Sequence, residues 1–375
     1  MNIIEECKKN NWKICMYGLG NIGINYGKEF LEYLDICPDF FCDRNQEKLD
    51  VYPVDISKKI SLKNLKDTHI DMLVLLMIGF LHEDEVRKEL SVNPKLHILT
   101  WGQICEREEV LKKFYGIERF PENGKRNRGA VYNNAIGKKK RKKASKIAVY
   151  TCITGNYDKL LAPMYIDNNC DYYLLTDVPD NIPIENEQYY TRINIFDKIP
   201  KEITKSNEQN RYCKMHGYEL FPDYRYSIYI DGNIQIIGPI SEYTKLIGKC
   251  GLATRRHHCT SIVYSGIMRI MVRGVIKRSE AIAAGNWLIA HGMPLCKNHF
   301  LCSVIICDHD NRIAINILNQ WFEYYMSNPV KRDQFYLPYV LWEMGIKDED
   351  VGVITNTVWN DQYVAMAEIH KHLND

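Results

Sequence analysis

A chain of 375 residues with 46% apolar side chains is long enough for two domains, each with its own buried core. Its 49 basic and 47 acidic residues nearly cancel, which argues against a global field that would recruit nucleic acid. Thirteen cysteines without a Cys-x-x-Cys pair argue against a disulfide framework or a cysteine zinc site. Together with an N-terminus that lacks a signal-peptide pattern, they predict a cytoplasmic protein.

Residues 13 to about 105 alternate strand and helix patterns, and the apolar run at 72–81 is typical of a central strand. Repeated alternation predicts a parallel sheet covered by helices on both faces. We therefore expect the α/β fold class, with a small Rossmann-like domain over residues 1–115. A basic linker would follow over 116–145 and a second domain over 146–375.

The linker ends in KKKRKK at 138–143. Such a run is most often solvated. Its functional alternative is weak adhesion to an anionic surface, which would place the protein peripherally at the inner face of the cell membrane.

A glycine motif follows the first expected strand. Gly18, Gly20 and Gly23 open a helix, and Asp43 lies twenty residues beyond, at the end of the next strand. This spacing is typical of a dinucleotide-binding loop, in which backbone N–H groups approach a pyrophosphate and the acidic residue accepts from ribose hydroxyls. The cofactor would be NAD(P) or another nucleotide. The alternative is a structural or regulatory domain without a ligand.

Two strands of the second domain end in polar loops. The first carries Thr151, Tyr157 and Asp158, and the next ends in Thr176 and Asp177. Ligands bind at the carboxyl ends of strands in open α/β sheets, so these loops could hold a nucleoside, with Tyr157 stacking on the base. The alternative for each loop alone is a capped turn.

A short helix follows these loops. Ser206-Asn207-Glu208-Gln209 has the pattern of a capping box, and Gly217 would close the helix. Arg211 and Lys214 share one helix face, so both cations could reach a diphosphate. A solvated basic face is the competing interpretation.

The stretch RYSIYIDGNIQI places Asp231 and Asn233 at the end of an alternating strand. Their two oxygens, separated by a glycine, could bind a hard cation or a sugar hydroxyl. A tight turn is the alternative, because Asp-Gly and Gly-Asn are frequent turn dipeptides.

These segments together resemble a glycosyltransferase-like domain family that includes plant mucilage- and turgor-related Golgi proteins and bacterial capsule or lipopolysaccharide enzymes. The resemblance covers about Lys146 to Ile346 and rests on five stretches: TCITGNYD, LLTD, KMHGYELFPDYRYSIYIDGNIQI, ATRRHHCTSIVY and KRDQFYLPYVLW. It implies a GT-A type fold, a UDP- or GDP-sugar donor and a glycan or glycolipid acceptor. It also implies Mn²⁺ or Mg²⁺ at an Asp-x-Asp-like element, here Asp231-Gly232-Asn233.

Further site residues follow from the resemblance. His257 and His258 match the family's Arg-His element and could complete the metal shell or contact the diphosphate. The chain departs from the family at Ser265, where a paired acidic stretch is expected. We therefore expect Asp333 to deprotonate or orient the acceptor hydroxyl, with Gln334 hydrogen-bonding the sugar; Asp333 as a helix cap, or Asp308 and His309 as the catalytic pair, are the alternatives.

The sequence thus predicts a metal-assisted glycosyltransferase acting on a surface polysaccharide. Two other classes stay open. An NAD(P)-dependent oxidoreductase or epimerase would use Gly18, Gly20, Gly23 and Asp43, and a catalytically degenerate binding protein would explain Asn233 and Ser265.

Overall fold

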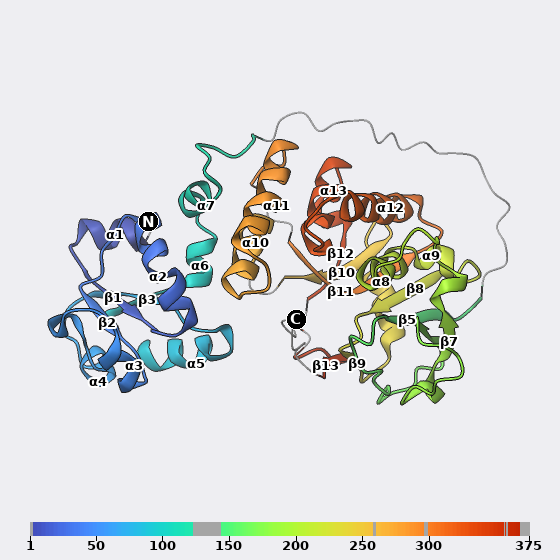
Figure 1. Cartoon of the computed structure of the whole chain (residues 1–375), viewed down its shortest axis with the longest axis horizontal. Helices are drawn as coiled ribbons and strands as arrows, with labels where there is room; N and C mark the ends of the chain where they lie inside the picture. Colours follow the sequence, from blue (N-terminus) through green and yellow to red (C-terminus); the bar gives the residue numbers. More distant parts are fainter. Residues whose placement is uncertain are drawn as a thin grey trace. The chain divides into compact units, whose positions relative to one another are not determined.

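The computed structural model describes residues 3–122, 144–257, 260–295, 299–355, 357 and 359–367 (Figure 1). The chain divides into two compact units. Unit 1 comprises Met1–Phe120 and Tyr264–Ile289, and unit 2 comprises Pro121–Val263 and Ala290–Asp375. The basic run at 138–143 lies outside the described residues.

Unit 1 is built on a four-stranded sheet in the order β2-β1-β3-β4, with every pair parallel. All residues of the central strand β3 are buried, as its continuous apolar run predicted. The strands are β1 (Lys13–Tyr17), β2 (Phe40–Cys42), β3 (Met72–Leu76) and β4 (Leu96–Thr100). The helices are α1 (Ile3–Lys9), α2 (Asn21–Leu34), α3 (Gln46–Val51), α4 (Leu62–Lys66), α5 (Phe80–Leu90), α6 (Trp101–Cys105) and α7 (Glu108–Tyr115).

Two helices from the second half of the chain complete unit 1: α10 (Val263–Val272) and α11 (Arg278–Ala290). The Tyr115 hydroxyl donates to the Tyr264 carbonyl at 2.8 Å, and the Arg269 guanidinium lies 4.7 Å from the ring centre of Trp101. The division by contacts therefore differs from the expected boundaries, which assign all of 146–375 to one domain.

Unit 2 contains a seven-stranded sheet in the order β12-β10-β11-β8-β5-β6-β7. β11 is antiparallel to both of its neighbours, and the remaining pairs are parallel. The strands are β5 (Ile147–Ile153), β6 (Cys170–Thr176), β7 (Thr191–Asn194), β8 (Tyr226–Ile230), β10 (Leu252–Arg256), β11 (Phe300–Asp308) and β12 (Gly352–Ile354). The predicted α/β fold class is confirmed, since both units have parallel strands connected through helices.

The remaining elements of unit 2 lie around this sheet. β9 (Ile234–Ile236) and β13 (Val364–Met366) form a separate two-stranded sheet. One core cluster joins the two sheets through side chains such as Val149, Ile228, Ile234 and Val364. The helices are α8 (Ser206–Met215), α9 (Gly217–Leu220), α12 (Arg312–Ser327) and α13 (Leu337–Glu343).

Replacing Gly285 by alanine tests the packing of α11 within unit 1. A Cβ there would lie 2.1 Å from Cε1 of Tyr115, whose buried ring is fixed by its bond to Tyr264. Overpacking of this kind typically costs about 1–3 kcal/mol, so Gly285→Ala should lower the free energy of unfolding by that amount. Chemical denaturation measures it. The exposed neighbour Asn286→Ala is the control, and equal stability of the two variants would contradict this packing.

Candidate functional site

The loops that follow β5 and β6 are tied to each other and to α8. The Gly155 N–H donates to Asp177 Oδ2 at 2.8 Å, and the Thr154 hydroxyl donates to the Ser206 carbonyl at 2.8 Å. Because β5, β6 and β8 are parallel, their carboxyl ends meet at one edge of the sheet. The predicted polar loops therefore converge at one edge, with α8 beside them.

Asp158 lies against the Asp-Gly-Asn turn. A Cβ added to Gly232 would come within 2.6 Å of Asp158 Oδ2, so only glycine permits this close approach. Gly155 and Asn156 carry the loop back toward the turn through left-handed conformations, with φ of 63° and 55°. The polar loop of β5 and the turn after β8 therefore form one acidic corner.

The Asp-Gly-Asn stretch is also a turn, so both of its interpretations fit the backbone. The Ile234 N–H donates to the Asp231 carbonyl at 3.0 Å, and the chain then enters β9. The Asp231 N–H donates to the Ser303 carbonyl at 2.9 Å, which fixes the turn to β11. Asn233 is buried, and its carbonyl accepts from Ala367 at 3.1 Å.

The two cations predicted on α8 point into this corner rather than into solvent. Lys214 Nζ lies 2.9 Å from Asp333 Oδ2 and 3.5 Å from Asp231 Oδ1, and the lysine side chain is 2% exposed. Arg211 Nε lies 3.2 Å from Asp333 Oδ1. The solvated basic face is therefore wrong: Arg211, Lys214, Asp231 and Asp333 form a charge cluster in which positive and negative side chains alternate.

The start of α8 differs from the predicted capping box. The N-cap position is Lys205, without a side-chain cap, and Asn207 Oδ1 accepts from the Glu208 N–H. Gly217 does not close α8 but begins α9. A Cβ at Gly217 would lie 2.4 Å from the Tyr150 hydroxyl, so glycine is required here by close packing.

The contacts in the cluster favour the charged forms of Asp333, Lys214 and Arg211. Burial alone would raise the pKa of the Asp333 carboxyl, but Arg211 and Lys214 lower it well below its usual range. Burial lowers the pKa of Lys214, but Asp231 and Asp333 outweigh it and raise the value above the ordinary one. In the same way, Asp333 raises the pKa of Arg211 against the effect of burial.

Asp333 begins a short 3-10 turn, Asp333–Phe335, and α13 starts only at Leu337 with Tyr336 as its N-cap. The helix-cap alternative for Asp333 is therefore wrong. Its carbonyl accepts from Trp321 Nε1 at 2.7 Å, which fixes the segment to α12. The Gln334 amide donates to the Phe300 carbonyl at 3.0 Å.

The residues expected to bind a nucleoside differ in their exposure and in their hydrogen bonds. Tyr157 is 60% exposed, and the Asp177 carboxylate holds the Gly155 N–H. Thr176 Oγ1 accepts from Val178 at 3.2 Å. The Thr151 hydroxyl is buried and has no hydrogen-bond partner among the described residues. Of this set, Tyr157 is the side chain that the structure leaves most open to a base.

His257 packs against another histidine. Its ring stacks on His299 with ring centres 4.6 Å apart, and its backbone N–H donates to the His299 carbonyl. His258 lies outside the described residues. Arg255, two residues before His257, is buried in an ion pair with Asp361 at 2.9 Å. Within the described part of the chain, no group of three or more His, Cys, Asp or Glu side chains is arranged to hold a metal ion.

Asp308 and His309 lie at the opposite edge of the sheet. Asp308 is the last residue of the antiparallel strand β11 and His309 follows it, with His309 Nε2 2.8 Å from the hydroxyl of Ser227, near the start of β8. They are therefore separated from Asp231 by the length of β8, and the weaker catalytic alternative is wrong.

Two site residues were missed from the sequence. Arg332 lies close enough to Tyr157 to lower its pKa, against the larger effects of burial and Asp158, which raise it. Asn210, on α8, donates from its amide to the Cys152 carbonyl at 2.6 Å and so fixes α8 to β5. Arg332 stands in the quoted KRDQ stretch, whereas no sequence signal marked Asn210.

The glycine motif of unit 1 has the geometry that its spacing predicted. Gly18 has φ of 100°, and a Cβ at Gly23 would lie 1.9 Å from the Gly18 carbonyl oxygen. Asp43 Oδ2 accepts from the Leu19 N–H at 2.6 Å, and its Oδ1 accepts from Asn45. Asp43 therefore orders the loop itself. Its role toward a ribose stays a prediction.

Similar solved structures include two glycosyltransferases. The chain is similar to the apo structure of the bifunctional glycosyltransferase WbbM, with a TM-score of 0.39 and 12% identity over 89% of this chain. The chain spans about half of that protein, 53% of its length. Mouse xyloside xylosyltransferase 1 in its apo form has a TM-score of 0.34 and 9% identity, over 56% of this chain and 85% of its own.

No family model matches the chain, and no curated protein matches its sequence. A likeness at these TM-scores does not show a function. None of the helices in the described part of the chain combines the length and apolar character needed to cross a bilayer.

The charge cluster predicts a pH-dependent contribution to stability. The pKa of Asp333 is lower in the folded protein than in the unfolded chain, so its carboxylate stabilises the fold above the unfolded value of about 4. That stabilisation is lost progressively as the pH falls further. Asp333→Asn leaves buried cations without this partner and should cost about 3–5 kcal/mol at pH 7.

Urea unfolding of wild type and Asp333→Asn from pH 7 to pH 3 measures this difference, which should shrink at the acid end. Asp348→Asn is the control, because its ion pair with Arg256 is exposed and should contribute less than about 1 kcal/mol. A loss for Asp333→Asn that is small at pH 7, or independent of pH, would contradict the cluster.

Proposed function

We propose that unit 2 is a glycosyltransferase that moves a sugar from a nucleoside-diphosphate donor to a hydroxyl of an acceptor. The observation that carries this proposal is the meeting of Arg211, Lys214, Asp158 and Asp231 at the carboxyl edge of the unit 2 sheet. A sheet edge of this kind is a common place for a ligand. Paired cations and carboxylates there suit a diphosphate and its counter-ion.

The donor diphosphate would bind at the Arg211 and Lys214 side chains. Both are held in place before the ligand arrives, since Asp333 contacts both of them. Fixed cations stabilise the charge that develops on the departing nucleoside diphosphate without reorganising during the reaction. Tyr157, the exposed ring of the β5 loop, would stack on the base, and Arg332 would add a further positive charge near it.

A divalent cation would be held by Asp231 together with Asp158, the carboxylate that lies against Gly232. Oxygen ligands suit Mg²⁺ and Mn²⁺, and Mg²⁺ in nucleotide sites is commonly bound by one or two carboxylates plus phosphate oxygens. Two protein carboxylates therefore fit such an ion, whose remaining ligands would be the diphosphate and water. When bound, the ion would neutralise charge on the leaving group.

Asp333 suits a positioning role better than the role of the base. A carboxylate whose pKa is held low by two cations is a weak acceptor of a hydroxyl proton. We therefore propose that Asp333 positions Arg211 and Lys214. Gln334, which donates to the Phe300 carbonyl, would orient the same segment.

The acceptor that we propose is a glycan or glycolipid of a surface polysaccharide, made in the cytoplasm, as the resemblance of the motifs implies. An oxidoreductase centred on unit 1 is the second candidate, motivated by the glycine motif around Gly18 and Asp43. Such an enzyme would not use the charge cluster of unit 2, so the transferase is the better-supported function.

Calorimetric titration with UDP, GDP and CDP, each with and without Mn²⁺, tests the donor site. One nucleoside diphosphate should bind in a Mn²⁺-dependent manner, and Asp231→Asn should weaken that binding about 10- to 100-fold, the loss of one charged contact. Asp223→Asn is the matched control. Asp223 is exposed and precedes β8, whereas Asp231 follows the same strand.

Equal binding by Asp231→Asn and wild type would remove Asp231 from the donor site. The absence of Mn²⁺-dependent binding of any of the three nucleoside diphosphates would contradict the transferase. Transfer activity is then followed as release of the matching nucleoside diphosphate from its sugar form.

A further inference from the structure

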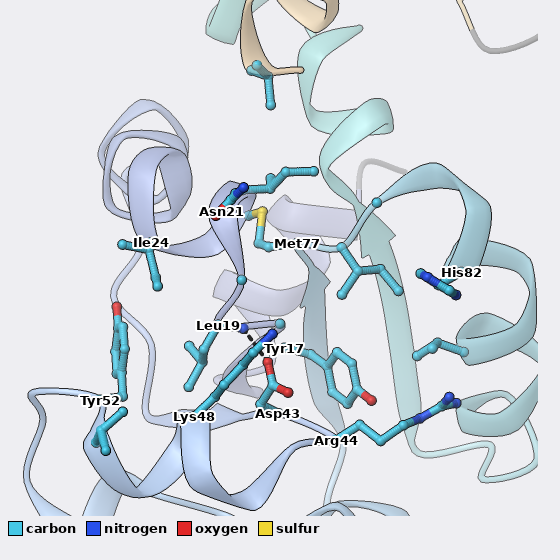
Figure 2. A pocket seen from close by; sticks show the side chains of 18 of the residues that line it. Tyr17, Leu19, Asn21, Ile24, Asp43, Arg44, Lys48, Tyr52, Met77 and His82 are labelled. Carbon is cyan, nitrogen blue, oxygen red and sulfur yellow. Dashed lines mark hydrogen bonds between the residues drawn. The ribbon is translucent and has the colours of Figure 1, made fainter. Parts of the chain in front are cut away.

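Unit 1 contains a cavity of about 1080 Å³ that the proposed transfer reaction does not use. It lies over the carboxyl ends of β1, β2 and β3, and every residue that lines it belongs to unit 1. Figure 2 shows the side chains of Tyr17, Asp43 and Lys48 gathered beside Leu19 in this cavity. Four features of its lining indicate what it binds.

The first feature is the start of α2. The first N–H groups of a helix have no acceptor within the helix. α2 is 14 residues long, its N-cap Gly20 provides no side-chain cap, and its first turn has no acidic residue. Asn21 and Ile22 line the cavity, so these N–H groups and the positive end of the helix dipole meet it.

The second feature is the hydroxyl of Tyr17. The side chain is 2% exposed, and its oxygen has no hydrogen-bond partner in the described part of the chain. Buried polar atoms are normally hydrogen-bonded, so an orphaned hydroxyl at a cavity wall indicates a missing partner. Burial raises the pKa of Tyr17 to about 12, which keeps the proton in place as a donor.

The third feature is the ammonium group of Lys48. Its Nζ lies 3.9 Å from the position of a Cβ on Gly20, at the glycine loop. No carboxylate of the described residues lies within ion-pair distance of it. Arg44, which also lines the cavity, pairs instead with Glu85 and Glu89 at 3.1 and 2.8 Å. Lys48 is thus one cation of this lining that an anionic ligand could pair with.

The fourth feature is the apolar part of the wall. Ile24 and Val51 are 59% and 81% exposed, so both have apolar surface that a ligand in the cavity could cover. They line the cavity together with Tyr52, Ile78 and Val272. A flat, apolar ring would cover these side chains.

We propose that unit 1 binds a nucleoside phosphate in this cavity, separately from the donor site of unit 2. The phosphate would lie at the start of α2 and Lys48, the ring against the apolar wall, and a polar edge of the nucleoside would pair with the Tyr17 hydroxyl. Asp43, whose oxygens order the loop, retains lone pairs for a ribose hydroxyl. This proposal goes beyond the transfer reaction, because unit 2 does not need it.

The test is calorimetric titration of the full chain carrying Asp231→Asn, in which the donor site is weakened. The probes are AMP, ADP, UDP, NAD and inorganic pyrophosphate. At least one nucleotide should bind with one site per chain, more tightly than pyrophosphate. Lys48→Met should weaken it at least tenfold and Tyr17→Phe about three- to tenfold.

Lys28→Met is the matched control, because Lys28 lies on α2 with its side chain 90% exposed and should leave the affinity unchanged. Pyrophosphate that binds as tightly as every nucleotide would overturn the nucleoside part of the proposal. If no nucleotide binds, or if Lys48→Met does not weaken nucleotide binding, the whole proposal is overturned. The transferase proposal fails if Asp231→Asn, in the otherwise wild-type chain, leaves nucleoside-diphosphate binding unchanged. That result does not depend on the Lys48 and Tyr17 variants.

Thermal unfolding without ligand gives a second measurement. If the Tyr17 hydroxyl lacks a partner in the folded protein, Tyr17→Phe should be at least as stable as wild type, because it removes an unsatisfied polar atom. A clear drop in Tm for Tyr17→Phe would show that the hydroxyl is already bonded and would overturn its assigned role.

Discussion

The buried ammonium group of Lys214 is the interaction on which the carboxyl edge of unit 2 depends. Removing a charge from water is costly unless it is paired, and this side chain is 2% exposed. Asp333 and Asp231 pair with it, and the Tyr229 ring lies 5.2 Å below it. Because Asp231 follows β8 and Asp333 follows α12, the buried charge on α8 ties three segments of the chain together.

Two glycines determine how closely the segments that carry these charges approach one another. Gly217 admits the Tyr150 hydroxyl beside the end of α8, and that hydroxyl donates to the Lys214 carbonyl at 3.2 Å. Gly232 admits Asp158 to the turn after β8. The carboxylates and cations can therefore approach because a side chain lies closer to the backbone of each of these glycines than a Cβ would allow. The glycines of the site act through packing as much as through conformational freedom.

Local patterns explain why much of this arrangement was predictable. Continuous apolar runs such as 72–76 mark buried parallel strands, and polar residues directly after a strand mark the ligand-binding edge. The same patterns do not indicate which side chains that are distant in sequence come into contact. Spacing placed Arg211 and Lys214 on one face of α8, but only the fold brings Asp333 to that face and buries it. The docking of α11 on Tyr115 likewise depends on shape at Gly285, which has no periodic signature.

The two units present charge to a ligand in different ways. In unit 2, Arg211 and Lys214 are already neutralised by Asp333 and Asp231, so a diphosphate can bind only by sharing or displacing carboxylate partners. Under the proposed function, a divalent ion bound at Asp231 would free part of the Lys214 charge for the phosphate, so metal and donor binding would support each other. In unit 1, Lys48 has no carboxylate partner among the described residues, so an anion needs no such exchange. Metal dependence should therefore distinguish the two sites even where both accept the same nucleotide.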